Sequence, residues 1–125
     1  MEIRQNLRYT EDHEWIRQDE NGVFIGITDF AQGELGDIVY IDIDTVGQHL
    51  EQGASFGSVE AVKTVSELFM PVSGTILAVN QALDTQPELV NAEPYDLGWM
   101  VQIQPDNTDD INSLLSADEY AKVIG

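Results

Sequence analysis

Cysteine is absent from this 125-residue chain, and basic residues are scarce. Without cysteine there are no disulfide bridges and no thiolate metal ligands, and such a composition fits a reducing compartment. The chain has 5 Lys or Arg residues against 23 Asp or Glu, which gives a formal net charge of −18. A field of this sign repels nucleic acid and anionic lipid and favours partner proteins with basic docking surfaces. The alternative, that the charge serves only solubility, stays open.

Long apolar runs are also missing. No stretch of about 20 apolar residues occurs, so we expect no membrane span. The N-terminal residues lack the apolar segment of a secretory signal, and the acidic residues that follow argue against an organellar transit peptide. We therefore expect a cytoplasmic protein. With 42% hydrophobic residues, the chain should form a single domain over residues 1–125 with its own core.

Patterns typical of enzymes and metal sites are not found either. His13-Glu14 begins like a zinc-protease motif, but the position of the second histidine holds Arg17. Asp42 begins like a calcium loop, but the twelfth position is Gly53, where a bidentate glutamate is required. No glycine-rich phosphate loop and no nucleophile elbow occurs. We therefore predict no catalytic residues and no metal ligands, and we do not expect an enzyme.

What the sequence does contain is a series of short strand-like segments. Six stretches are rich in β-branched or aromatic residues, and most have a glycine or proline near their ends. They are Val23 to Thr28, Ile38 to Ile43, Phe56 to Val62, Val65 to Met70, Thr75 to Asn80 and Trp99 to Gln104. Strands of this length and spacing favour an antiparallel sandwich or a flattened barrel.

One short helix is expected inside the strand-rich part. Residues Asp29 to Leu35 follow Thr28, and either Thr28 or Asp29 could cap the first turn. Gly36 should end this helix, because glycine tolerates the backbone conformation found after a last turn.

A second helix is expected at the C-terminus. The run Ser116-Ala-Asp-Glu119 has the capping-box pattern and predicts a helix through Ile124. Residues 108–115 are expected to belong to the same helical region. Residues 86–97 contain two prolines and are interpreted as a long loop.

Lysine is so rare that its placement is informative. The chain has two lysines. Lys122 lies near the end of the predicted terminal helix, where a cation suits the helix dipole. Lys63 lies between two predicted strands, at or beside a hairpin tip that has no Asn-Gly or Asp-Gly turn. Lys63 could be an ordinary turn residue, but an amine on a flexible stem held out from a rigid scaffold also suits enzymatic acylation.

The sequence around Lys63 resembles the lipoyl-attachment region of glycine cleavage H proteins. The similar stretch is Gly57-Ser-Val-Glu-Ala-Val-Lys-Thr-Val-Ser-Glu67, followed by Pro71-Val-Ser-Gly74. Further segments match the family in order: Tyr9 with His13-Glu14-Trp15; Gly26-Ile-Thr28-Asp29 with Ala31-Gln32 and Leu35-Gly36-Asp37; and Asn91, Pro94-Tyr95 and Gly98-Trp99-Met100. The matches span residues 9–100, and the predicted terminal helical region also fits the family.

This resemblance implies a mostly β fold, the barrel-sandwich hybrid of lipoyl and biotinyl domains, with a short internal helix and a C-terminal helical region. It implies a carrier in the glycine cleavage system and in one-carbon metabolism. Lipoate joined to Lys63 as an amide would carry the aminomethyl group from glycine decarboxylase, a pyridoxal-phosphate enzyme, to aminomethyltransferase. Dihydrolipoyl dehydrogenase would reoxidise this swinging arm, and lipoate-attaching enzymes would install it.

The resemblance also implies roles for three acidic residues. Glu14 and Glu67 match positions near the cleft that shields the loaded arm in the family, where a carboxylate would favour a protonated amine. The alternative is that both are solvated surface acids. Glu60, three residues before the lysine, matches a position read by the modifying enzyme.

Four positions depart from the family pattern. Phe30 replaces a residue that is often His or Tyr, Ala61 and Thr64 flank the lysine where Ser and Ala are commoner, and Gln102 replaces a residue that is often basic. These departures leave room for a paralogue that relays lipoyl groups to other complexes. An acidic binding module without a prosthetic group is the alternative from another class.

Two other swinging-arm classes fit the sequence less well. Biotin carriers usually flank their lysine with methionines, whereas Val62 and Thr64 flank Lys63. Lipoyl domains of acyltransferase complexes are shorter and lack segments like His13-Glu14-Trp15 and Gly98-Trp99-Met100. An intact mass of protein from lipoate-producing cells would separate these classes.

Overall fold

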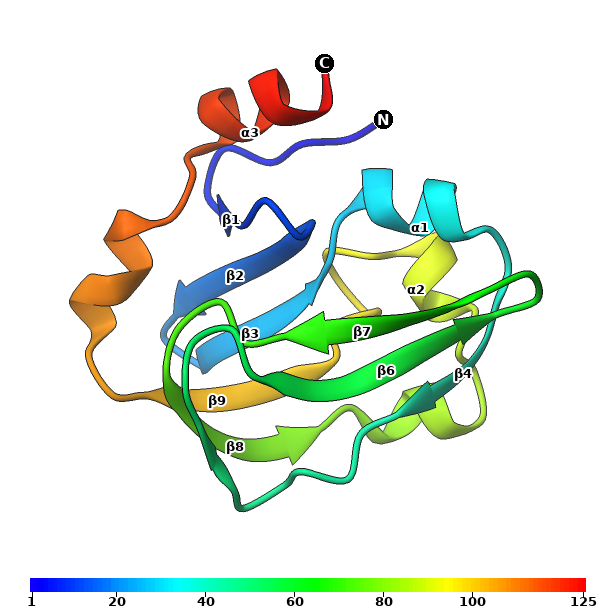
Figure 1. Ribbon diagram of the computed structural model, residues 1–125, viewed down its shortest axis with the longest axis horizontal. Coiled ribbons are helices and arrows are strands. Elements are labelled where there is room, and N and C mark those ends of the chain that lie inside the picture. Colours follow the sequence, from blue (N-terminus) through cyan, green and yellow to red (C-terminus); the bar gives the residue numbers. More distant parts are fainter.

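The computed structural model describes residues 1–125 and consists mainly of two antiparallel sheets with the core between them (Figure 1). The larger sheet has the strand order β1-β2-β3-β9-β8-β5. Its strands are β1 (Arg8–Tyr9), β2 (Glu14–Asp19), β3 (Gly22–Ile27), β9 (Val101–Pro105), β8 (Gly74–Val79) and β5 (His49–Leu50). The smaller sheet has the order β4-β6-β7, with β4 (Ile38–Asp42), β6 (Ser55–Ala61) and β7 (Val65–Phe69).

Short helical segments connect and cover these sheets. They are α1 (Asp29–Leu35), η1 (Gln81–Asp84), α2 (Leu89–Ala92), η2 (Thr108–Ser113) and α3 (Ala117–Ile124), where η denotes a 3₁₀ helix. None of them combines the length and the apolar character that a bilayer crossing requires. The main core holds 18 buried side chains from both sheets and from the segments that connect them, among them Ile25 from β3 and Val59 from β6.

The predicted strands are confirmed, and three further strands were not predicted. All six expected segments form strands, with ends that differ by one or two residues. The missed β1 and β5 have only two residues each, too few to produce a pattern. The missed β2 buries its first three residues and exposes its last two, so it lacks the alternation that marks a half-buried strand.

Both predicted helix caps are confirmed. At α1 the Thr28 hydroxyl accepts a hydrogen bond from the Ala31 amide, and Gly36 follows the helix with φ of 79°. At α3 the Ser116 hydroxyl accepts from the Glu119 amide at 3.2 Å, and the Glu119 carboxylate accepts from the Ser116 amide at 2.9 Å. Both helices are short, so these local bonds satisfy a large share of their free backbone groups.

Two expectations for the irregular segments were wrong. Residues 108–115 do not continue into the terminal helix: η2 stops at Ser113, and Leu115 is extended and exchanges two 2.9 Å backbone hydrogen bonds with Tyr9. The segment 86–97 is not entirely loop, because α2 forms within it and buries Val90 completely. In both cases long-range packing decides the local structure, and the sequence pattern carries no signal for it.

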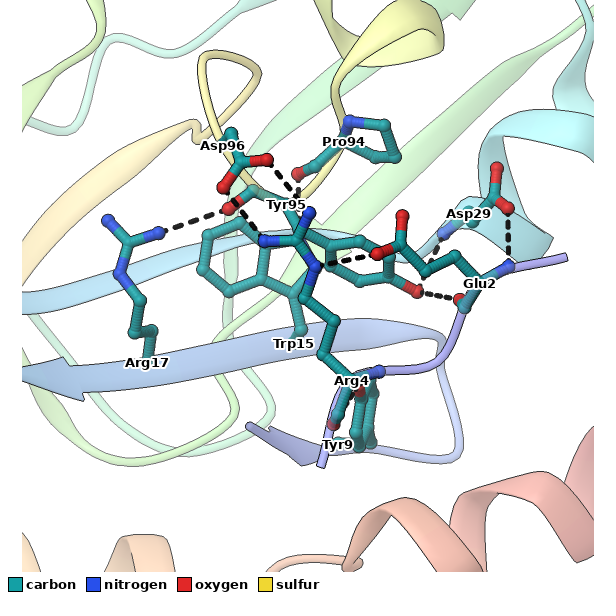
Figure 2. Close-up of polar contacts among 9 residues, drawn as sticks. All are labelled: Glu2, Arg4, Tyr9, Trp15, Arg17, Asp29, Pro94, Tyr95 and Asp96. Carbon is teal, nitrogen blue, oxygen red and sulfur yellow. Dashed lines mark hydrogen bonds and ion pairs between the residues drawn. The ribbon is translucent and has the colours of Figure 1, made fainter. Parts of the chain in front are cut away.

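A second, smaller core lies under the N-terminal segment and is built from aromatic rings. The Trp15 indole donates to the Pro94 carbonyl at 2.9 Å, and Tyr9 stacks on Tyr120 of α3 at 4.6 Å (Figure 2 shows the Trp15 contact). The Tyr95 hydroxyl donates to the Glu2 carbonyl at 2.5 Å. These contacts join the chain ends to β2 and to the loop after α2.

The N-terminal segment is fastened across this core by an arginine. Arg4 forms two 2.8 Å hydrogen bonds to the carboxylate of Asp96 and a third to Glu2 (Figure 2). The guanidinium holds the pKa of Asp96 below its usual value, mainly through these hydrogen bonds. The Asp29 carboxylate accepts from the Glu2 amide at 2.7 Å, so the same segment also contacts the first residue of α1.

Gly26 offers a test of the aromatic core. Gly26 pairs with Trp15 across β2 and β3, and a Cβ at position 26 would lie 2.6 Å from the indole ring. Because Pro94 fixes that indole, Gly26→Ala should reduce the free energy of unfolding by about 1–3 kcal/mol. Gly33→Ala, at an exposed position of α1, is the matched control: nothing lies within 4 Å of a Cβ at this position, so the change should be neutral or stabilising. Equal denaturation midpoints for the two variants would contradict this packing argument.

Candidate functional site

Lys63 lies at the tip of the hairpin formed by β6 and β7. The Ala61 amide donates to the Thr64 carbonyl at 2.8 Å and closes the turn, and the side chains of Val62, Lys63 and Thr64 are exposed. The Val62 amide donates to the Asp37 carbonyl at 3.0 Å, which ties the tip to the chain after α1. The amine is therefore accessible, but the backbone that carries it is held at both sides.

The Lys63 side chain lies along the end of α1. A Cβ built on Gly36 would be 3.6 Å from Cε and 3.9 Å from Nζ of Lys63. The glycine leaves room for the lysine stem, and the carbonyl end of the helix favours the charged amine. Lys122 is also exposed, but it lies on α3, so accessibility alone does not separate the two lysines.

A cleft of about 360 Å³ lies between α1 and the lysine-bearing hairpin. Ile27, Val59 and Leu68 give its base an apolar character, and four carboxylates line it as well. The lining residues are Asp12, His13, Glu14, Ile27, Phe30, Ala31, Glu34, Leu35, Val59, Ser66, Glu67 and Leu68. Such a lining suits a ligand that has an apolar stem and a cationic end.

Glu14 is buried in this cleft, with an exposed fraction of 2%, so the interpretation as a solvated surface acid is wrong for this residue. Its carboxylate accepts from the Thr10 hydroxyl at 2.8 Å and from the Phe69 amide at 3.3 Å. Burial raises the pKa of Glu14 to about 7; these two hydrogen bonds lower it and the charge of Asp12 raises it. A carboxylate that titrates near neutral pH responds strongly to an approaching charge.

Glu14 and the lysine lie toward opposite ends of β7. Val65 begins this strand beside the tip, and Phe69, which donates to Glu14, ends it. Four residues of strand cover about 13 Å. The cleft therefore connects the region of the tip with the buried carboxylate.

The other two predicted acidic residues occupy different surroundings. Glu67 lines the same cleft, is exposed, and accepts from the Ser55 hydroxyl at 2.5 Å. Glu60 is exposed beside the tip and is not part of the cleft lining. Its neighbours in the sheet are Tyr40 on β4 and Val65 on β7. Glu14 and Glu67 thus both line the cleft and Glu60 does not, although the strand register places the Glu67 side chain on the same outward face of the small sheet as Glu60.

His13 also lines the cleft, a position that neither the incomplete zinc motif nor the resemblance of His13-Glu14-Trp15 to the family had predicted. It is the one non-glycine residue with positive φ, 70°, and its Nδ1 lies 2.8 Å from the Tyr120 hydroxyl. That hydroxyl also lies 2.7 Å from the hydroxyl of Thr28, which already accepts from Ala31. Both hydroxyl hydrogens are bonded if the Thr28 hydroxyl donates to the Tyr120 hydroxyl and the Tyr120 hydroxyl donates to Nδ1 of His13. The imidazole then presents its other nitrogen as a donor.

Two more lining residues could have been found from helix periodicity. Phe30 and Glu34 are four residues apart on α1 and line the cleft together. The Phe30 ring lies 4.9 Å from the His13 ring, so the apolar substitution at this position still packs against the cleft wall.

Three comparisons with known proteins match the same family over nearly the whole chain. The family model described as Glycine cleavage H-protein matches residues 7–125. The glycine cleavage system H protein of Bacillus cereus (strain B4264) is 53% identical over 123 residues, 98% of this chain and 97% of that protein. The protein of the same name from Listeria monocytogenes serotype 4b (strain CLIP80459) is 48% identical, covering 99% of each chain. The crystal structure of a glycine cleavage system H protein from Mycobacterium marinum covers 96% of this chain and 97% of its own, with a TM-score of 0.86 and 39% identity.

Proposed function

The chain belongs to the glycine cleavage H-protein family, and from this we infer that it is the lipoyl-bearing shuttle of the glycine cleavage system, with the lipoyl group on Lys63. As an H protein it is a carrier rather than a catalyst, and its partners are components of that system. The fold predicted from the sequence, a mostly β barrel-sandwich hybrid with a C-terminal helix, is confirmed by the structure and by the Mycobacterium marinum relative. The alternatives of a lipoyl relay and of a binding module without a prosthetic group are not favoured.

The residues present fit a lipoyl group. Lys63 offers an exposed primary amine at a braced tip, and the adjacent cleft has an apolar base for a hydrocarbon stem. When bound, the lipoyl group supplies paired sulfur atoms that carry the aminomethyl group from glycine decarboxylase to aminomethyltransferase and that dihydrolipoyl dehydrogenase reoxidises. The assignment of these three enzymes as the docking partners is part of the proposal.

The protein's own residues position and protect this cargo. The hairpin backbone fixes the attachment point through its bonds to Thr64 and Asp37, while the lysine stem keeps the far end mobile. The carboxylates of Glu14 and Glu67 favour a cationic amine in the cleft, and the apolar base excludes water from its stem. Glu60, outside the cleft, is available to the lipoate-attaching enzyme.

The observation that carries the proposal is the position of Lys63, one of two lysines, at an exposed tip beside a cleft of suitable chemistry. The direct test is the intact mass of the protein produced in cells that synthesise lipoate. A single lipoyl adduct supports the proposal. A biotin adduct, or no adduct under conditions that modify a known lipoyl protein, would contradict it.

Docking on the partner enzymes is expected to depend on salt. The formal charge of −18 becomes −19 when Lys63 is acylated, and exposed charges are screened over about 8 Å at physiological ionic strength. The apparent affinity for the decarboxylase should therefore fall as sodium chloride is raised, which titration calorimetry or KM values can measure. A flat response would mean that shape and apolar contacts govern docking and that the acidity serves solubility.

A further inference from the structure

Three exposed apolar side chains gather around Lys63 on the face of the small sheet that points away from the core. Val62 in the turn, Val65 on β7 and Tyr40 on β4 have exposed fractions of 76%, 61% and 54%. Single exposed apolar residues are common on soluble proteins. Here, however, they occur together beside one functional lysine, on a surface dominated elsewhere by acids.

The strand register places these side chains next to one another. Glu60 on β6 is paired with Tyr40 on one side and with Val65 on the other. Directly paired residues point to the same face of a sheet, with Cα atoms about 5 Å apart, so Tyr40 lies about 10 Å from Val65. The next register position, with Ile41 and Val59, points into the core. The row Tyr40, Glu60 and Val65 on this face, with the exposed Val62 in the adjoining turn, is here called the tip patch.

We propose that the tip patch is the docking surface for the enzyme that acylates Lys63, with Tyr40 as its aromatic anchor. The proposal rests on the function proposed for Lys63 and adds a residue, Tyr40, that lies 23 positions away in the sequence. A carboxylate between two apolar side chains offers such an enzyme one charged contact and two apolar contacts in a fixed order.

The geometry of acylation favours this occupant over the other partners. An enzyme that acylates Lys63 must bring its catalytic centre to Nζ, so its surface covers the residues around the tip. A typical interface buries about 800 Å² per partner, a disc of roughly 16 Å radius, which includes Tyr40. Enzymes that act on the far end of the arm need not cover the tip. Aromatic residues, tyrosine among them, are enriched among the interface residues that contribute most to binding.

The test uses the unmodified full-length protein and a purified lipoate-attaching enzyme. Tyr40→Thr and Val65→Thr keep strand-forming side chains and remove apolar surface. Leu77→Thr is the matched control, because Leu77 is 47% exposed on β8 of the other sheet. Acylation of Lys63 is followed by intact mass at several protein concentrations. We expect Tyr40→Thr to lower kcat/KM about tenfold or more, mainly through KM, Val65→Thr to have a smaller effect, and Leu77→Thr to stay within about twofold of wild type.

Thermal denaturation of each variant separates loss of docking from loss of folding. If Tyr40→Thr folds like wild type and is acylated at the wild-type rate, the tip patch is not the docking surface. If Tyr40→Thr is acylated normally but is a poor substrate for the decarboxylase, the tip patch binds the decarboxylase and not the acylating enzyme, and the proposal is wrong. If wild type itself is not acylated on Lys63, the proposed function fails, which is a different outcome from failure of the tip patch.

Discussion

Replacing Lys63 with arginine is expected to abolish lipoylation and shuttling while leaving the fold intact. The side chain is exposed at a hairpin tip, so its packing contribution is small. Arginine keeps the positive charge, but its guanidinium stays protonated and cannot act as the amine nucleophile that forms an amide. Loss of glycine cleavage activity in the reconstituted system should therefore be complete, whereas the denaturation midpoint should change little.

Lys122→Arg is the matched control, because Lys122 is the other lysine and is also exposed. Peptide mapping of wild-type protein from lipoate-replete cells should find the adduct on the Lys63 peptide, and Lys122→Arg should be modified normally. An adduct on Lys122, or full activity of Lys63→Arg, would overturn the assignment.

Local signals in the sequence were sufficient for much of the fold. The six predicted strands were bounded by glycine or proline, and the caps at Thr28 and Ser116 depend on residues within three positions. The lysine could be placed at a turn for the same reason, since strands flank it on both sides. These features depend on neighbours in the chain, which a single sequence contains.

The features that could not be predicted depend on distant partners. Glu14 is buried because β7 places the Phe69 amide over it, and Leu115 is extended because it pairs with Tyr9. Tyr40 becomes a neighbour of Glu60 only through the register of β4 on β6. Such pairings form only when the sheets assemble. The resemblance to the family therefore indicated that Glu14 lies near the cleft, but the sequence did not predict that Glu14 is buried.

Glu14→Gln is expected to shorten the lifetime of the loaded carrier by about tenfold to a hundredfold. Glutamine keeps the size of the side chain but cannot carry a negative charge, and its one amide oxygen can accept from only one of the two donors, Thr10 and Phe69. A charge-assisted hydrogen bond to a cationic amine contributes about 1.5–3 kcal/mol, and 1.36 kcal/mol corresponds to a factor of ten in an equilibrium. The amine should therefore leave the cleft more often and hydrolyse faster, while acylation of Lys63 stays normal. Release of ammonia and formaldehyde from purified loaded protein, without partner enzymes, measures this rate.

The pH dependence of this effect distinguishes a charge interaction from a change in shape. The raised pKa of Glu14, about 7, means that the carboxyl is mostly neutral at pH 6 and mostly ionised at pH 8. Only the ionised form pairs with the amine, and the amine itself draws that pKa downward, so the midpoint should fall at or below about 7. The ratio of mutant to wild-type decay rates should therefore be largest at pH 8 and shrink as pH falls. An NMR titration of the Glu14 carboxyl in the unloaded protein gives the pKa independently of any cargo.

Glu34→Gln, which removes an exposed acid from the same cleft, should change the decay rate much less. Equal decay rates for Glu14→Gln and wild type across this range would transfer the protective role to Glu67 or to the apolar base of the cleft.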